Sequence, residues 1–302
     1  MAEPEADDPI RRQFLPDPRE ALSDPFALDD PLGEKLHRVT PRLVHQYRDK
    51  ALLLSGGSCA GFCRYCFRRV RLSSPEAFIS AEELKPVLAY LQARPDIKEI
   101  LVSGGDPLAA GNAEIENLFG KLRKAREDIS IRLCSRVPIT LPERLDAQTI
   151  KILTRFKPLR IATQINHPRE IAEASALSSV VKAGIPVLVQ TVLLRGINDR
   201  AETLAALFNK CLGLGLKPYY LFQLDLAPGI SHFRVPLKTG LAIYRELESL
   251  VSDLPPYAVD LPGGGGKIRL SEGVIAGEEE RPGGRVYLLK GGDGRLWEYP
   301  AE

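Results

Sequence analysis

The sequence predicts an α/β protein built as a partial (β/α)6 barrel of the TIM type, and two observations carry this prediction. Six short runs of aliphatic, β-branched or aromatic residues recur along the chain, each bounded by Gly, Pro or Asp, as buried strands usually are. Segments with the apolar period of a helix lie between several of these runs. Such alternation indicates a parallel sheet with right-handed crossovers, in which chemistry lies at the carboxyl ends of the strands.

The elements follow one another in a regular order. Strands are expected at residues 51–55, 98–104, 130–135, 159–165, 185–194 and 218–225. Helices are expected at residues 80–93, 112–125 and 176–184. Ser80 and Glu83 form a capping-box pattern at the start of the first helix, and Gly184 ends the last one. The final residues, 285–302, predict a β-hairpin with a Gly-rich turn.

The chain divides into three expected units: an N-terminal arm, extended or short-helical, at residues 1–45; the α/β barrel at 46–255; and a C-terminal unit at 256–302 that holds a glycine–lysine loop and the hairpin. The 302 residues carry a formal net charge of only +2, which argues against a nucleic-acid partner. No apolar run is long enough to span a membrane, and the acidic N-terminus lacks the apolar core of a secretory signal. We therefore expect a cytoplasmic protein.

Three of the five cysteines lie close together after the first strand. Cys59, Cys63 and Cys66 are spaced C-x3-C-x2-C, and such thiolates bind zinc or iron–sulfur clusters. Structural zinc needs four ligands, and no further cysteine or histidine lies at a zinc-like spacing. A [4Fe–4S] cluster held by three cysteines leaves one iron open for a substrate or cofactor. Structural zinc and three inert buried cysteines are the alternatives.

The stretch "DLPGGGGKIRL" (260–270) is the second informative motif. It is not a P-loop, because Leu261 stands where that motif needs Gly and Ile268 where it needs Ser or Thr. Four glycines allow the backbone to approach a bulky ligand, and Lys267 could form a Schiff base with pyridoxal phosphate (PLP). The alternative is a flexible surface loop with a solvated lysine.

Taken together and in this order, these motifs resemble those of the lysine 2,3-aminomutase family, whose members are PLP-dependent radical S-adenosylmethionine (SAM) enzymes. The resemblance runs from residue 30 nearly to the C-terminus and includes "SGGDPL", "CSRVPITLPERL", "NHPREI", "VLLRGINDR" and "KPYYLFQLDLAPGISHFRVP". It implies a radical SAM barrel and an isomerase that moves the α-amino group of L-lysine to Cβ, giving β-lysine. An aminomutase for another cationic amino acid such as arginine, and a non-enzymatic iron–sulfur or zinc protein, are the alternatives.

The resemblance also implies a role for each motif residue. The [4Fe–4S] cluster is expected on Cys59, Cys63 and Cys66, and SAM is expected beside Tyr65, Ser103, Gly104, Gly105 and Asp106. PLP is expected on Lys267, the substrate carboxylate on Arg68, and the side-chain ammonium on Asp225 and Asp260. Without the resemblance, Asp225 reads as a strand-end cap, Asp260 as a turn residue and the glycine pair as a tight turn.

The implied partners are a small amino-acid substrate and an electron donor such as flavodoxin or ferredoxin, which would reduce the cluster so that SAM is cleaved to a 5′-deoxyadenosyl radical. The sequence departs from the family at two places. Arg200 stands where a zinc ligand is usual and no cysteine follows Cys211, so we expect no zinc and leave a homo-oligomer open. Gln46 and Lys50 replace arginines associated with the PLP phosphate region, and Arg48 is a candidate to compensate.

Overall fold

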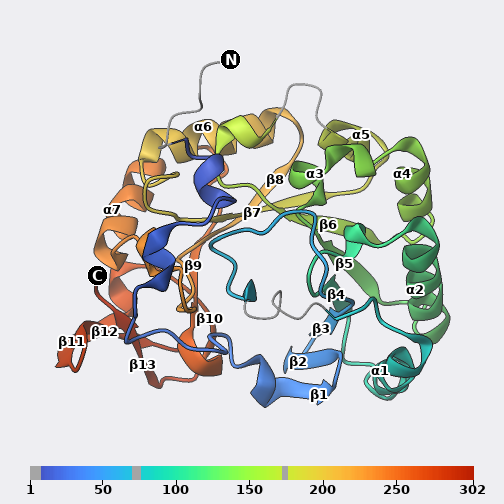
Figure 1. The fold of residues 1–302 in the computed structure, drawn as a ribbon, viewed down its shortest axis with the longest axis horizontal. Helices are drawn as coiled ribbons and strands as arrows, with labels where there is room; N and C mark the ends of the chain where they lie inside the picture. Colours follow the sequence, from blue (N-terminus) through green and yellow to red (C-terminus); the bar gives the residue numbers. More distant parts are fainter. Residues whose placement is uncertain (1–7, 70–75, 172–175) are drawn as a thin grey trace.

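Ten strands form one mixed sheet that curls into an open barrel in this computed structural model, which describes residues 8–69, 76–171 and 176–302 (Figure 1). The strands follow each other in chain order, from β1 to β10, so each new strand is added beside the previous one. The two outermost strands, β1 and β10, are not paired with each other. The sheet is therefore a partial barrel, as the sequence predicts.

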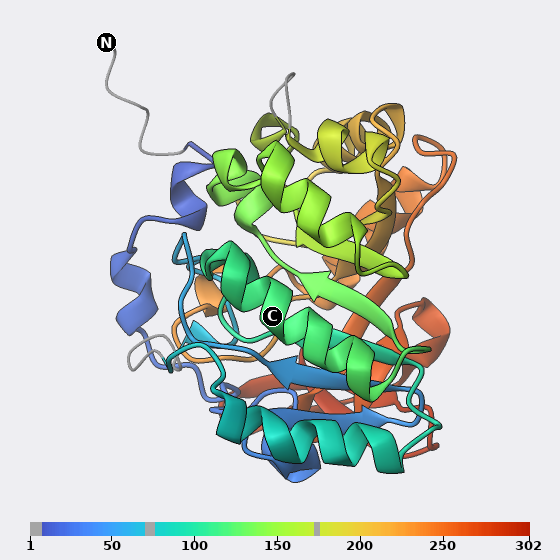
Figure 2. The same ribbon diagram turned by 90° about the vertical axis from the view of Figure 1, so that its right-hand side faces the viewer.

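Six strands of the barrel coincide with the six predicted runs, and all six are parallel. They are β3 (Lys50–Leu54), β4 (Glu99–Ser103), β5 (Ser130–Cys134), β6 (Leu159–Gln164), β7 (Val187–Val192) and β8 (Lys217–Phe222). The connecting helices are α1 (Ala81–Ala93), α2 (Asn112–Ala125), α3 (Val137–Thr140), α4 (Ala147–Thr154), α5 (Ala176–Lys182), α6 (Ala201–Gly213) and α7 (Leu237–Leu247). They cover the outer face of the barrel (Figures 1 and 2).

Four further strands extend the sheet beyond the predicted six. They are β1 (Arg38–Thr40), β2 (Leu43–Tyr47), β9 (Tyr257–Leu261) and β10 (Gly266–Arg269). Strand β9 is parallel to β8, whereas β1, β2 and β10 pair antiparallel with their neighbours. Strand β9 was not predicted as a seventh parallel strand, because its short apolar run lies between a proline pair and the glycine run. This seventh strand carries Asp260.

The C-terminal residues form a separate three-stranded antiparallel sheet. The predicted hairpin is confirmed as β12 (Gly284–Lys290) and β13 (Leu296–Pro300), and β11 (Ile275–Arg281) pairs with the other side of β12. At the other end of the chain, residues 8–37 contain three short 3-10 helices, at Arg11–Gln13, Pro18–Ala21 and Glu34–His37. Residues 1–7 of the expected arm lie outside the described residues.

The local helix signals act as predicted. The Ser80 hydroxyl accepts a hydrogen bond from the backbone of Glu83, whose carboxylate accepts one from the backbone of Ser80. Gly184 ends the chain segment after α5 with a φ of +72°, a conformation that glycine adopts without strain. None of the helices in the described ranges is long and apolar enough to cross a membrane.

Alternation along the strands separates the core from the barrel interior. Ile100, Val102, Leu133 and Ile161 are fully buried in the main hydrophobic core, which the helices cover. Burial of each such side chain contributes about 1.5–3 kcal/mol. The intervening positions, which include Leu101, Arg132, Cys134, Ala162 and Gln164, line the interior cavity. The interior of this barrel is therefore an open cavity with polar and charged side chains set in a largely apolar wall, and not a packed core.

Candidate functional site

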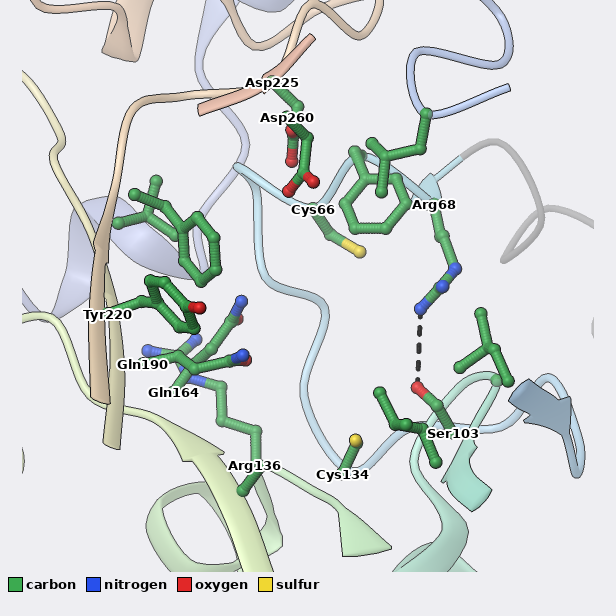
Figure 3. Close-up of a pocket in the computed structure, with 18 of the residues that line it drawn as sticks. Cys66, Arg68, Ser103, Cys134, Arg136, Gln164, Gln190, Tyr220, Asp225 and Asp260 are labelled. Atoms are coloured by element: carbon green, nitrogen blue, oxygen red, sulfur yellow. Dashed lines mark hydrogen bonds between the residues drawn. The ribbon is translucent and has the colours of Figure 1, made fainter. Parts of the chain in front are cut away.

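A cavity of about 590 Å³ runs through the barrel from the carboxyl ends of the strands. All the site residues expected from the sequence line this cavity, although they come from segments far apart in the chain. They are Cys59, Cys63, Tyr65, Cys66, Arg68, Ser103, Gly104, Gly105, Asp106, Asp225, Asp260 and Lys267. Figure 3 shows several of them with side chains directed toward a common space.

Salt bridges to the N-terminal arm fix the loop that carries the cysteines. Glu20 accepts hydrogen bonds from the guanidinium groups of both Arg64 and Arg69, the latter at 2.6 Å. Arg69 also donates to the carbonyl of Gly229, and the backbone N–H of Arg64 donates to the carbonyl of Gln13. The arm therefore holds the loop from outside while the thiols face the cavity.

The glycine pair after β4 forms the other support of the cysteine loop. The backbone N–H of Gly105 donates to Gly56 at 2.6 Å, and a Cβ on Gly104 would lie only 2.3 Å from the same Gly56 carbonyl oxygen. A Cβ on Gly105 would lie 2.3 Å from the carbonyl oxygen of Ser58. Glycine is therefore required at both positions for the loop to dock, whatever ligand the turn also contacts.

Asp106 joins this turn to the end of β5. Its carboxylate accepts hydrogen bonds from the backbone N–H groups of Leu108, Arg136 and Val137, the shortest at 2.7 Å. Burial nonetheless raises the pKa of this carboxyl group, against the effect of these donors. Asp106 thus serves the protein framework directly.

The three cysteine thiols suit an iron–sulfur cluster better than a single metal ion. Among the described residues, no three His, Cys, Asp or Glu side chains converge on one point, as the ligands of one ion must. Thiolates that each bind a different iron of a cluster need no such convergence. Burial raises the pKa of Cys59 to about 12 and that of Cys66 to about 11, so cluster uptake must displace protons.

Arg136 connects Cys63 with the arm. Its guanidinium lies 2.8 Å from the Cys63 sulfur and donates to Gln13 at 2.6 Å and to Glu170 at 3.1 Å. It also lies over the ring of Tyr65, with 5.3 Å between the guanidinium carbon and the ring centroid. This buried cation therefore links the cysteine loop to the arm and to the loop after β6.

Arg68 projects into the cavity on the side of β4. It forms a buried ion pair with Glu34 of the arm and lies 3.4 Å from the hydroxyl of Ser103, a contact drawn in Figure 3. A planar guanidinium pairs well with a carboxylate, and Glu34 is such a partner within the protein itself. Any substrate carboxylate bound to Arg68 must therefore share it with Glu34.

Two aspartates and Lys267 form a second charged group across the cavity. Lys267 donates to Asp260 at 2.6 Å from the neighbouring strand and lies over the ring of Phe222 at 4.0 Å. Asp225 is partly buried at the cavity wall, and desolvation there together with the Asp260 charge raises its pKa to about 7. Figure 3 shows the two carboxylates side by side. This group has more acidic than basic side chains, which suits a cationic ligand.

The glycine run forms the turn between β9 and β10. Gly263, Gly264 and Gly266 have positive φ angles, and a Cβ on Gly265 would lie 2.7 Å from the Trp297 ring. A Cβ on Gly33 would lie 2.6 Å from Gly264, so the arm also packs closely here. None of the four glycines lines the cavity. In this structure they therefore approach other parts of the protein, and the residues that line the cavity, Lys267 among them, follow the glycines on β10.

Comparison with known proteins agrees with this geometry. Residues 53–208 match the Radical SAM superfamily. The chain is 44% identical over 299 residues to a Treponema pallidum protein that carries the name L-lysine 2,3-aminomutase as a provisional assignment, covering 96% of this chain and 83% of that protein. It is 37% identical to an Escherichia coli protein named L-lysine 2,3-aminomutase, covering 85% and 76% of the two chains. The chain belongs to the lysine 2,3-aminomutase family.

Membership in this family confirms the resemblance seen in the sequence, the assignment to isomerases and the radical SAM fold, which implies a [4Fe–4S] cluster and SAM. Some relatives are longer: the chain spans 64% of the Clostridium subterminale protein of that name, at 36% identity. Solved structures show the fold alone. Streptococcus suis SuiB bound to S-adenosylmethionine superposes with a TM-score of 0.53 over 74% of this chain and 52% of that chain, at 12% identity.

Sequence reasoning missed three polar residues around this family site: Gln13, Glu34 and Arg136. Arg136 lies in "CSRVP", which contributed to the resemblance without a role of its own. Its position directly after β5 was the available signal, because polar residues at the carboxyl ends of barrel strands face the site. Gln13 and Glu34 had no such signal, since an irregular arm reveals its partners only in the folded chain.

Proposed function

We propose that this chain is a SAM- and PLP-dependent aminomutase that moves the α-amino group of L-lysine to Cβ and so forms β-lysine. One observation carries the proposal: the three cysteines, Lys267, Arg68 and the aspartate pair all line one cavity. One small molecule in this cavity could therefore reach the cluster ligands, a lysine able to hold PLP, and groups that recognise both ends of a diamino acid. The relatives' names support the same reaction.

The cysteine end would hold the cluster and SAM. Cys59, Cys63 and Cys66 would supply the three thiolates, and the contact from Arg136 would hold the Cys63 sulfur in place. Tyr65 is buried against Phe233 and lines the cavity, so its ring offers a surface for the adenine. A reduced cluster with bound SAM supplies a 5′-deoxyadenosyl radical, and the protein's part is to position the substrate and exclude water.

Lys267 is the residue that would hold PLP. It lies at the edge of the cavity between aromatic rings, with Phe222 at 4.0 Å and Tyr220 at 5.4 Å from its ammonium nitrogen. PLP bound there supplies a conjugated system that stabilises an unpaired electron next to the migrating nitrogen. Asp260 contacts the same amine at 2.6 Å and would help to orient it.

Substrate lysine carries one carboxylate and a distant ammonium, and the cavity offers a partner for each. Arg68 would bind the carboxylate through its guanidinium, with Ser103 as a second support. Asp225 and Asp260 would bind the side-chain ammonium, whose three donors match the acceptors of two carboxylates. A glutamate side chain would bring a third negative charge to these aspartates, which excludes it on electrostatic grounds.

The decisive experiment is anaerobic reconstitution with iron and sulfide, followed by incubation with SAM, PLP, a reductant and single amino acids. We expect about four irons per chain, β-lysine from lysine and nothing from glutamate. Borohydride treatment should attach PLP to Lys267. β-Arginine in place of β-lysine would identify arginine as the substrate. A colourless protein with one zinc, or PLP attached to another lysine, would contradict the proposal.

The reaction also needs an electron donor, for which a flavodoxin or ferredoxin is the expected class, and a reducing compartment such as the cytoplasm. The electron donor and the reducing compartment are both parts of this proposal. They are tested by replacing the chemical reductant with each purified donor and measuring β-lysine formation.

A further inference from the structure

One cationic side chain in the cavity has no partner. Six lysines and arginines line the cavity within the described part of the chain, and five of them contact a carboxylate. These five pairs are Lys50–Asp49, Arg68–Glu34, Arg132–Glu99, Arg136–Glu170 and Lys267–Asp260. Arg269 is exposed at the mouth of the cavity and has neither an ion pair nor a side-chain hydrogen bond among the described residues, so its charge is available to a ligand.

Arg269 lies on the same strand and the same side as Lys267. The two residues are two positions apart on β10, where Lys267 is opposite Asp260 and Arg269 is opposite Ala258. Alternating strand residues face the same side, and two positions span about 7 Å. Both side chains line the cavity. A flat molecule joined to Lys267 at one end could therefore reach Arg269 with its other end.

The β2–β3 hairpin meets β10 at the same place. The backbone of Lys267 lies beside the hydroxyl of Tyr47, and burial raises the pKa of Tyr47 to about 12. Tyr47 pairs with Lys50 across the hairpin, and both residues line the cavity. Lys50 has only a distant partner, with its ammonium 3.8 Å from Asp49. Arg269 and Lys50, at the open side of the barrel, are thus two cations without a close carboxylate partner among the described residues.

We propose that Arg269, assisted by Lys50, forms an anion subsite that binds the phosphate of PLP held by Lys267. This inference rests on the proposed function. Gln46 and Lys50 stand where the family resemblance places arginines, and the Gln46 amide is engaged with the Gly264 carbonyl at 3.2 Å. Arg48, the sequence-based candidate to compensate, does not line the cavity. A guanidinium on β10 supplies the bidentate contact to phosphate that these positions lack.

The test compares binding of PLP and of pyridoxal, which lacks the phosphate, by absorbance titration of the reconstituted protein. Arg269→Gln should weaken PLP binding about tenfold or more, as expected for loss of one charge-assisted contact, and leave pyridoxal binding unchanged. Arg269→Lys should restore part of the PLP affinity. Arg48→Gln is the matched control and should bind PLP as the wild type does. Inorganic phosphate should compete with PLP in the wild type and poorly in Arg269→Gln.

Equal PLP affinity in wild type and Arg269→Gln would overturn the inference, and so would an equal loss of PLP and pyridoxal binding. Loss of PLP affinity in Arg48→Gln alone would assign the phosphate to the hairpin turn instead. If borohydride attaches no PLP to Lys267 in the wild type, the proposed function fails. The titration with inorganic phosphate then tests the subsite separately. Phosphate binding that Arg269→Gln abolishes supports the subsite, and phosphate binding that this variant leaves unchanged refutes it.

Discussion

The two ends of the cavity differ in how the protein matches their charges. At the cysteine end, Arg64, Arg69, Arg68 and Arg136 are each paired with a glutamate of the arm or of the loop after β6. At the lysine end, Lys267 has one carboxylate, partly buried Asp225 has no cation in direct contact among the described residues, and Arg269 has no partner. The first end is assembled by the protein itself, whereas the second is completed by ligands.

This contrast predicts that mutations at the two ends of the cavity change different properties of the protein. Changes at the cysteine end should alter the framework or the cluster, with effects on metal content or on unfolding. Changes at the lysine end should alter ligand affinity and its pH dependence while the fold remains intact, because these side chains have few charged partners within the described protein to lose.

The largest effect is expected at the cluster ligands. Cys59→Ala, Cys63→Ala or Cys66→Ala should each abolish SAM cleavage, since the loss of one thiolate leaves the cluster with too few ligands. Iron content and 5′-deoxyadenosine formation are the measurements, with Cys211→Ala, a buried cysteine remote from the cavity, as the control. A cluster-ligand variant that keeps full iron and full SAM cleavage would refute the assignment.

The next effect concerns the aspartate pair. Asp225→Asn and Asp260→Asn should each lower lysine affinity or efficiency about 10²–10³-fold, since breaking a buried charge pair costs about 3–5 kcal/mol. Iron content and PLP loading should persist. The discriminating quantity is the ratio of lysine to norleucine, which lacks the ammonium. If Asp225 were only a strand-end cap and Asp260 only a turn residue, stability would fall and this ratio would not change.

The pH dependence of lysine binding sharpens the same point. The pKa of Asp225 is raised to about 7, so its carboxyl group is protonated below that value and ionised above it. An ammonium ligand favours the ionised form, so lysine affinity should rise about tenfold between pH 6 and pH 8, with proton release on binding. Titration calorimetry measures both. Norleucine binding and the Asp225→Asn variant should show no such rise across this range.

The smallest effect is expected in the arm. Glu20→Gln leaves Arg64 and Arg69 without their shared carboxylate and should lower the free energy of unfolding by about 1–3 kcal/mol. Thermal unfolding of the reconstituted protein measures this. Glu116→Gln, which removes an exposed ion pair with Arg155, is the control and should change stability by less than about 1 kcal/mol. Equal shifts in the two variants would mean that the arm does not hold the cysteine loop.

The sequence by itself determined the features that depend on local patterns. Strand and helix periods predicted six parallel strands and three of the helices between them, the capping box predicted the start of α1, and three closely spaced cysteines indicated a cluster. Lys267 was identified by the glycine run before it, although the glycines themselves pack against Gly33 and Trp297 and do not line the cavity. The structure places Lys267 at the cavity, and the assignment of PLP to it stays a prediction, while the glycines before it serve packing within the protein.

Only the tertiary structure decided the polar partners. Gln13 meets Arg136 across 123 residues, Glu34 meets Arg68 across 34, and Glu20 meets Arg69 across 49. Such contacts leave no periodic signal, because each depends on where the curled sheet brings two distant segments together. The same holds for Arg269, whose significance lies in the absence of a carboxylate beside it in the described structure. Local propensity and spacing specify elements and ligand sets, but charge matching is a property of the assembled fold.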